Sequence, residues 1–247
     1  MKLFEGIRIE NGQIVFDFKS DLPTDVIPLK FQKINKSLST RQGTRIYFAY
    51  KYNESANPEE IAKVRQAIKM LDYSTISESD LKLMISKSIN NFLSISDNSF
   101  DVIVTPKSSG GLANKIAQAF KDKLGSNVLI ATDSIVKASV NNIQIDPEKL
   151  KKMSPGQIQN INKVIQSATK DGSFKMKSVP IPMRRTIIDF MKFDNSASRE
   201  IFNRIAQGSV LLIDDIYTGG STFNEMSRLI NLQSSNPLTG FVFLLSK

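Results

Sequence analysis

Two adjacent carboxylates, Asp214 and Asp215, follow an apolar run in the stretch VLLIDDIYTGGSTFNEM, residues 210–226. The apolar run predicts a buried strand that brings both acids to one end of a sheet. Neighbouring residues of a strand point to opposite faces, so we do not expect the two carboxylates to chelate one ion as a simple pair. One carboxylate can face a ligand, and carboxylate oxygens are good acceptors for the hydroxyls of a vicinal diol such as a ribose.

The loop that follows the acids favours a ligand of negative charge. Gly219 and Gly220 allow successive backbone N–H groups to turn toward one point, and the helix predicted after them adds the positive end of its dipole. The hydroxyls of Thr218, Ser221 and Thr222 supply further donors. A phosphate suits this loop, so acceptors for a sugar diol lie beside donors for a phosphate. That combination fits a 5-phosphoribosyl group.

A second loop of related composition is TPKSSGG, Thr105 to Gly111, between a predicted strand at 101–106 and a predicted helix at 112–124. A lysine supplies charge, serines supply donors, and glycines permit close approach of a ligand to the backbone. The helix start that follows again suits an anion. A solvated connection would have the same composition. The candidate ligand-binding residues are Lys107, Ser108, Ser109 and Gly110.

Strands alternate with helices around both loops. Besides the segments already given, strands are predicted at 127–133, 210–215 and 240–246, with a helix at 223–232. This order predicts an α/β fold with a parallel sheet and right-handed crossovers. In such sheets ligands bind at the carboxyl ends of the strands, where both loops should lie.

The chain divides into an N-terminal region, 1–95, and an α/β core, 96–247. The first region should contain a hairpin turn at Asn11 and Gly12, a strand at 44–52, and helices at 58–71 and 78–92. Residues 139–185 interrupt the core with a polar, lysine-rich segment. Weak helices are predicted there at about 146–153 and 154–169, with the capping-box spacing of Ser154 and Gln157. A segment of this length and polarity is expected to be a flexible lid.

The amino-acid composition excludes several kinds of catalytic and metal-binding site. The chain has 247 residues, no cysteine and no histidine, which excludes disulfides, cysteine-based zinc sites and a Ser/His/Asp triad, and leaves any metal to oxygen ligands. The formal charge of +9, from 33 basic against 24 acidic residues, favours an anionic partner, although lysines also serve simply as solubilising residues. The N-terminus lacks the apolar segment of a signal peptide, and no apolar run could span a membrane. We therefore expect a soluble cytoplasmic protein.

The stretch IDDIYTGGST resembles the signature of type I phosphoribosyltransferases and is most similar to the ComF-like branch, whose form is close to DDxYTTGST. Gly219 stands where threonine is usual, which removes one hydroxyl and keeps the backbone amides. The resemblance covers about 101–247, with a looser match at FAYKYNE, 48–54. The cysteine-rich zinc ribbon and the arginine-glycine-asparagine element of ComF proteins are missing from this sequence.

The resemblance implies a phosphoribosyltransferase-type, Rossmann-like core with an N-terminal hood and a long flexible loop. It implies that Asp214 and Asp215 contact ribose hydroxyls, partly through Mg²⁺ and its waters. It further implies that residues 218–222 hold the 5-phosphate and that the loop after the first core strand holds the pyrophosphate.

Four other residues take roles from this comparison. The family's flexible segment corresponds to 139–185, and at its end Arg184 and Arg185 would stabilise charge on the departing pyrophosphate. A solvated surface pair would look the same in sequence. Arg199 is a loose match to a family arginine. Tyr217 would either line the acceptor site or pack against the loop at 218–222.

The predicted function is transfer of the phosphoribosyl group from phosphoribosyl pyrophosphate, with Mg²⁺, to a nitrogenous acceptor, with release of pyrophosphate. Two alternatives remain open. One is a non-catalytic ribose-phosphate-binding or ComF-like nucleic-acid-associated protein. The other is a ribose-phosphate diphosphokinase-like enzyme, which would need an ATP site, although the sequence has no GxxxxGK[ST] loop. The expected partner is a ribose phosphate, nucleic acid and a homodimer are further options, and no membrane partner is expected.

Overall fold

The structure is a computed structural model of the chain. It describes residues 2–4, 7–16, 26–28, 45–51, 55–96, 99–107, 110–172, 174–195, 197–217, 220–236 and 238–245. Four predicted site residues lie outside this described part: Ser108, Ser109, Thr218 and Gly219.

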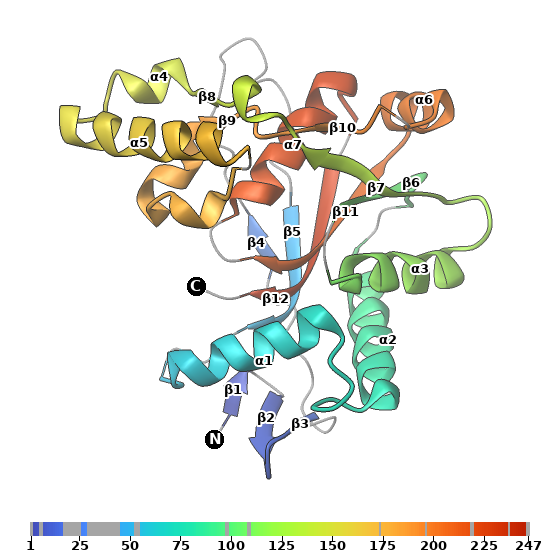
Figure 1. The fold of residues 1–247 in the computed structure, drawn as a ribbon. Helices are drawn as coiled ribbons and strands as arrows, with labels where there is room; N and C mark the ends of the chain where they lie inside the picture. Colours follow the sequence, from blue (N-terminus) through green and yellow to red (C-terminus); the bar gives the residue numbers. More distant parts are fainter. Residues whose placement is uncertain are drawn as a thin grey trace.

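A seven-stranded sheet forms the centre of the molecule, and its middle five strands are parallel (Figure 1). The edge strands β10 and β4 run antiparallel to their neighbours. In spatial order the strands are β10 (Met191–Phe193), β7 (Leu129–Lys137), β6 (Val102–Pro106), β11 (Val210–Tyr217), β12 (Leu238–Leu245), β5 (Arg45–Lys51) and β4 (Val26–Pro28). The predicted α/β class with a mostly parallel sheet is confirmed.

Helices cover both faces of the sheet, because the strands alternate their apolar side chains between two cores. In β11, Leu211 and Ile213 face one core, while Val210 and Leu212 face the other. The first core is covered by α1 (Pro58–Met70), α2 (Glu78–Ile95) and α3 (Leu112–Leu124). The second is covered by α5 (Pro155–Asp171), α6 (Arg199–Gln207) and α7 (Ser221–Gln233).

Short elements complete the fold. A three-stranded antiparallel sheet is formed by β1 (Lys2–Phe4), β2 (Ile7–Glu10) and β3 (Gln13–Phe16). The strands β8 (Gln144–Ile145) and β9 (Ile187–Ile188) form a two-stranded ladder. The remaining helical turns are α4 (Pro147–Leu150), η1 (Val140–Asn142), η2 (Met176–Ser178) and η3 (Ile181–Thr186).

Local signals in the sequence set several element boundaries. Helix α1 begins after Asn57, whose side chain accepts a hydrogen bond from the Glu59 N–H at 2.9 Å. The β2–β3 turn places Asn11 at φ 50° and Gly12 at φ 79°, as a tight hairpin requires. The predicted capping box of α5 is confirmed, because Ser154 and Gln157 each bond the backbone of the other at 3.3 and 2.9 Å.

The N-terminal region shares its core with the rest of the chain. Phe92 of α2 lies at the centre of an aromatic cluster, with ring centroids 5.0 to 5.9 Å from its four partners. These are Tyr47 of β5, Phe100, Phe120 of α3 and Phe241 of β12. Strand β5 also pairs with β12, so the strand predicted at 44–52 extends the main sheet. The predicted boundary at residue 95 therefore crosses a continuous core.

Several short elements were not predicted from the sequence, and β10 and α6 are two of them. Strand β10 has only three residues, too few for a period to be visible. Helix α6 is only nine residues long, but its apolar residues Ile201 and Ile205 have helical spacing, so a signal visible in the sequence was missed there. The helices predicted within 139–185 are present as α4 and α5, and the role of this segment as a lid stays a prediction. Among the described residues, no helix combines the length and the apolar character needed to cross a membrane.

Candidate functional site

The strand order reverses between β6 and β11, which are neighbours in the sheet. After β6 the chain forms α3 on one face and then β7; after β11 it forms α7 on the opposite face and then β12. Such a reversal separates the two loops that leave the strands and opens a crevice at their carboxyl ends. Both loops predicted to bind ligand leave these two strands, so the topology brings them to the same crevice.

The acid pair is buried at the end of β11. Asp214 and Asp215 are 7% and 3% exposed, and the Asp215 N–H donates a hydrogen bond of 2.9 Å to Oδ1 of Asp214. Asp215 continues the face of Leu211 and Ile213, where α1 packs, and its Oδ2 lies 3.3 Å from Nζ of Lys69. The side of the strand that Asp215 takes agrees with the predicted alternation.

Burial makes the charge of this pair costly. The pKa of Asp214 is raised well above its usual range, first because burial removes water from the carboxylate and second because Asp215 is negatively charged beside it. The ammonium of Lys69 acts in the opposite direction, but more weakly. A cation bound at Asp214 would favour the ionised carboxylate. The site is therefore suited to a ligand that arrives with a cation or with hydroxyl donors.

Helix α7 begins directly after the acid-bearing strand. Gly220 precedes it in the left-handed conformation, at φ 72°, and no side chain of the described residues caps its first turn. The first N–H groups of a helix have no partner within the helix, so those at Ser221 and Thr222 suit an anion. A Cβ on Gly220 would lie 2.8 Å from Cε2 of Tyr217 and still closer to its hydroxyl. Tyr217 therefore packs over Gly220, in agreement with a packing role.

The β6–α3 loop ends in the same way as the loop before α7, with a glycine in the left-handed conformation. Gly111, at φ 71°, precedes α3, again without a side-chain cap among the described residues. Lys107 is exposed, and its backbone N–H donates to the carbonyl of Ile135 at 2.8 Å. A Cβ on Gly110 would lie 2.8 Å from the carbonyl carbon of Lys69 and still closer to its oxygen. The loop therefore packs directly against the end of α1.

Lys69 was given no place in the site by the sequence. In the structure its backbone touches Gly110 and its ammonium reaches Asp215, so it connects the β6–α3 loop with the acid-bearing end of β11. Its position depends on the packing of α1 beside the ends of β6 and β11, which no local pattern around residue 69 reveals. The only sequence signal was the loose match formed by FAYKYNE, 48–54, and the helix after it, which ends near Lys69.

Arg184, which was predicted to contact the pyrophosphate, makes a hydrogen bond within its own segment of the chain. Nε of Arg184 donates to the carbonyl of Val179 at 2.9 Å, within the turn that leads into η3. The side chain of Arg185 lies outside the described residues. Arg199 is the first residue of α6 and is exposed. A role for these arginines at the pyrophosphate stays a prediction.

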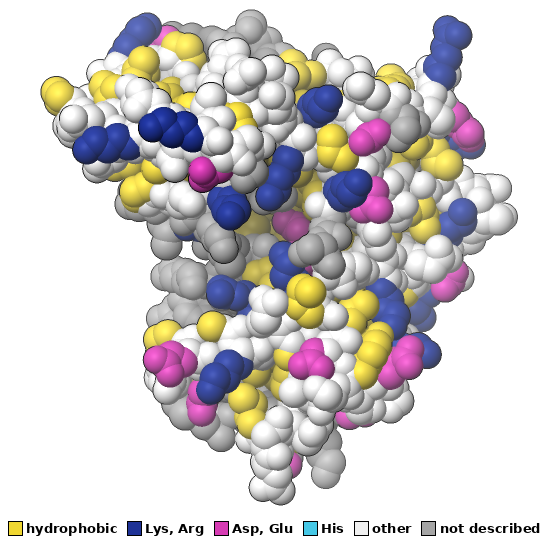
Figure 2. All heavy atoms as spheres, in the orientation of Figure 1, with side chains coloured by type: hydrophobic (Ala, Val, Ile, Leu, Met, Phe, Trp, Pro, Cys, Tyr) yellow, Lys and Arg dark blue, Asp and Glu magenta, His cyan; other side chains and the backbone are white. Residues whose placement is uncertain are grey.

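Positive charge surrounds a hollow on the face shown in Figure 2. Lys and Arg side chains gather around this hollow, which lies between the part of the molecule formed by α1 and the part formed by α5 and α7. An acidic side chain is visible inside it. Basic groups around a recessed acid favour a ligand that carries negative charge and meets the acid through a cation or hydroxyls.

A second hollow, of about 860 Å³, lies between the β2–β3 hairpin and α1. Its lining includes Ile9, Ile14, Lys63, Ala67 and Met70. The helical positions of Lys63, Ala67 and Met70 place this hollow on another side of α1 from Lys69. It is therefore separate from the acid pair.

Comparison of the chain with protein-family models and with curated proteins gives no match. What the site can bind must therefore follow from its own geometry.

Proposed function

We propose that the protein is a phosphoribosyltransferase-like enzyme. It would bind phosphoribosyl pyrophosphate with Mg²⁺ and transfer the phosphoribosyl group to a nitrogenous acceptor. The observation that carries the proposal is the juxtaposition of two buried carboxylates, Asp214 and Asp215, with the glycine-led start of α7, which no described side chain caps, at the reversal point of the sheet. Acceptors for a diol and donors for a phosphate are thus separated by one short turn.

The ligand would be held at three places. The carboxylates accept hydrogen bonds from the ribose hydroxyls, and the N-terminal amides of α7 hold the 5-phosphate. The β6–α3 loop, with Lys107 and Gly110, receives the pyrophosphate. Support for this arrangement comes from the two neighbouring strands that carry the loops and from the basic rim of the hollow in Figure 2.

The proposal implies a magnesium ion. Among the described residues there is no group of three or more His, Cys, Asp or Glu that could hold a metal by itself. Mg²⁺ is commonly bound by one or two carboxylates, waters and substrate phosphates, which is the donor set that Asp214 and Asp215 with this ligand would provide. When bound, the ion would neutralise negative charge on the pyrophosphate.

The residues of the chain would act mainly by positioning. The bond from the sugar C1 to pyrophosphate breaks with its electrons on the leaving group, while the acceptor nitrogen forms the new bond to C1. Positive charge develops on the ring, close to the buried carboxylates, which stabilise it. The sequence has no histidine, so an acceptor nitrogen that is already deprotonated suits this site best.

The test is pyrophosphate release from phosphoribosyl pyrophosphate in the presence of Mg²⁺ and a panel of nitrogenous bases. Release should depend on one acceptor and should be lost in the double variant Asp214→Asn/Asp215→Asn. The matched control is Asp122→Asn, at an exposed aspartate near the far end of α3, which should behave like the wild type.

Other outcomes would select another function. Binding without turnover for the whole panel would identify a non-catalytic ribose-phosphate-binding protein. Formation of phosphoribosyl pyrophosphate from ribose 5-phosphate and ATP would identify a diphosphokinase. Salt-sensitive DNA binding that is indifferent to the double variant would indicate a nucleic-acid partner. Failure to bind any ribose phosphate would refute the site itself.

A further inference from the structure

We propose that Lys69 is a ligand-binding residue of this site. In the structure its ammonium pairs with Asp215, and on binding it transfers to the diphosphate group of the ligand. The inference rests on the proposed function and extends it to a residue of the N-terminal region. It assigns to α1 the recognition of the leaving group.

The exposure of the two partners shows how a ligand would meet them. The side chain of Lys69 is 34% exposed, whereas that of Asp215 is 5% exposed, and their charged atoms are 3.3 Å apart. The lysine thus extends from the surface to a buried carboxylate. A ligand that reaches Asp215 from solvent meets the ammonium of Lys69 on the way. Because Asp215 is buried, moving the ammonium away would be costly unless another cation took its place, and the Mg²⁺ of the proposed ligand complex would supply that positive charge.

The backbone of Lys69 lies at the other loop. Its carbonyl group packs against Gly110 so closely that no Cβ could fit there. The main chain of Lys69 therefore contacts the loop proposed for pyrophosphate, and its side chain contacts the acid proposed for the ribose. A lysine has a flexible stem, so rotation about its own side-chain bonds can carry the ammonium from Asp215 toward an anion at Gly110.

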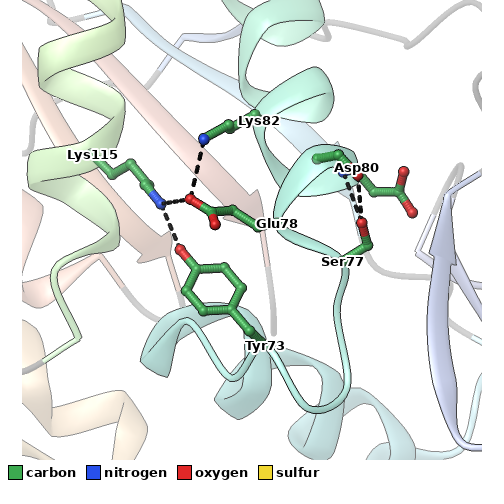
Figure 3. A network of polar contacts seen from close by, with 7 residues as sticks. Tyr73, Ser77, Glu78, Asp80, Lys82 and Lys115 are labelled. Carbon is green, nitrogen blue, oxygen red and sulfur yellow. Dashed lines mark hydrogen bonds and ion pairs between the residues drawn. The ribbon is translucent and has the colours of Figure 1, made fainter.

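The end of α1 is fixed in this place. Leu71 follows α1 as its C-cap in the left-handed conformation, and the Asp72 N–H donates back to the Ala67 carbonyl at 2.9 Å. Beyond it, Nζ of Lys115 on α3 donates to the Tyr73 hydroxyl at 2.5 Å and lies 3.5 Å from Glu78 (Figure 3). These contacts tie the segment after α1 to α3. The segment after α1, and with it Lys69 at the end of that helix, is thus held against α3, the helix that follows the β6–α3 loop.

The network in Figure 3 keeps its charges at neutral pH. The pKa of Lys115 is raised, chiefly by the hydrogen bond with Tyr73. The pKa of Glu78 is lowered, chiefly by the hydrogen bond with Lys82. The connection between the segment after α1 and α3 therefore remains charged whether or not a ligand is present.

Binding of three probes tests the assignment: phosphoribosyl pyrophosphate, inorganic pyrophosphate and ribose 5-phosphate, each measured by calorimetry with Mg²⁺. Lys69→Met should weaken binding of the two diphosphate probes by about tenfold or more, as expected for loss of a charge-assisted hydrogen bond. Binding of ribose 5-phosphate should change by less than about threefold, and Lys69→Arg should restore much of the loss. The matched control is Lys63→Met, at an exposed lysine of the same helix.

The outcomes separate this proposal from the proposed function. If the wild type binds the probes but Lys69→Met binds the diphosphates equally well or more tightly, the role of Lys69 is refuted and the site stands. Equal weakening for all three probes also refutes it. If the wild type binds none of the probes, the proposed function fails and this inference fails with it.

A second measurement does not depend on the folding of a variant. The wild-type protein is reductively methylated with ¹³C, which keeps the lysine charge, and the dimethylamine signals are followed by NMR. The signal of Lys69 should shift on addition of pyrophosphate and that of Lys63 should not. An unchanged Lys69 signal at saturating pyrophosphate would overturn the proposal.

Discussion

Replacing Gly110 by alanine should damage the junction between α1 and the β6–α3 loop. The new Cβ would lie 2.8 Å from the carbonyl carbon of Lys69, whereas ordinary contacts of this kind begin at 3.4 Å, so the two segments must separate by about 0.6 Å or more. The two nearest atoms belong to the backbone of Lys69, so rotation of a side chain cannot relieve the clash. Overpacking of this kind costs roughly 1–3 kcal/mol in unfolding free energy. We expect the upper half of that range.

The same displacement reaches the acid pair. Nζ of Lys69 lies 3.3 Å from Oδ2 of Asp215, so a shift of this size would stretch or break the ion pair. If the proposed activity is present, a misplacement approaching 1 Å should lower turnover by as much as about 100-fold.

Urea unfolding followed by circular dichroism measures the stability effect. The control is Gly156→Ala, because Gly156 lies in the first turn of α5 and a Cβ there would meet nothing within 4 Å. That variant should be neutral or gain up to about 1 kcal/mol from higher helix propensity. If Gly110→Ala is as stable as Gly156→Ala to within about 0.5 kcal/mol, the close packing of Lys69 on the loop is refuted.

Three further predictions concern other parts of the fold. Asp214→Asn should stabilise the protein at neutral pH. Because the pKa of Asp214 is raised, the contribution of this group to wild-type stability is fully present below the unfolded pKa of about 4 and is lost as pH rises through the folded pKa. Urea unfolding against pH should show a gain that grows toward neutral pH, and a gain confined to acidic pH would contradict this. Phe92→Ala should lower the unfolding free energy by about 3–5 kcal/mol in the same assay, because it empties the centre of the aromatic cluster; a loss below about 1 kcal/mol would contradict that packing. Ser154→Ala should cost about 1 kcal/mol through loss of the cap of α5 and should speed amide exchange in its first turn, whereas Ser167→Ala, at an exposed mid-helix position, should do neither.

Local patterns predicted the elements that carry the candidate site. Helix α3 has the predicted bounds, Leu112–Leu124, because an apolar stripe and flanking glycines define it within a short window. The strand that carries Asp214 and Asp215 was predicted from four apolar residues followed by two acids. These features depend on contacts within a few residues, so the sequence alone expresses them.

Assembly of the sheet could not be predicted in the same way. The strand at 44–52 was predicted, but its pairing with β12 depends on which apolar edge is left open once the other strands have packed. Strand β10 has too few residues for a periodic signal, and only its pairing with β7 makes it a strand. The pairing of strands that are far apart in the sequence depends on the total apolar area that both faces of the sheet bury.

The sequence by itself determined that two acids and a glycine-led helix start lie on one strand–turn–helix unit, because propensity and periodicity act over a dozen residues. Only the tertiary structure decided that β6 and β11 are neighbours at the reversal of the sheet, and that Asp214 is buried deeply enough to raise its pKa. It also decided that Lys69, from a distant helix, reaches Asp215. Burial and charge proximity are sums over residues far apart in the chain, so they exist only when the whole core is in place.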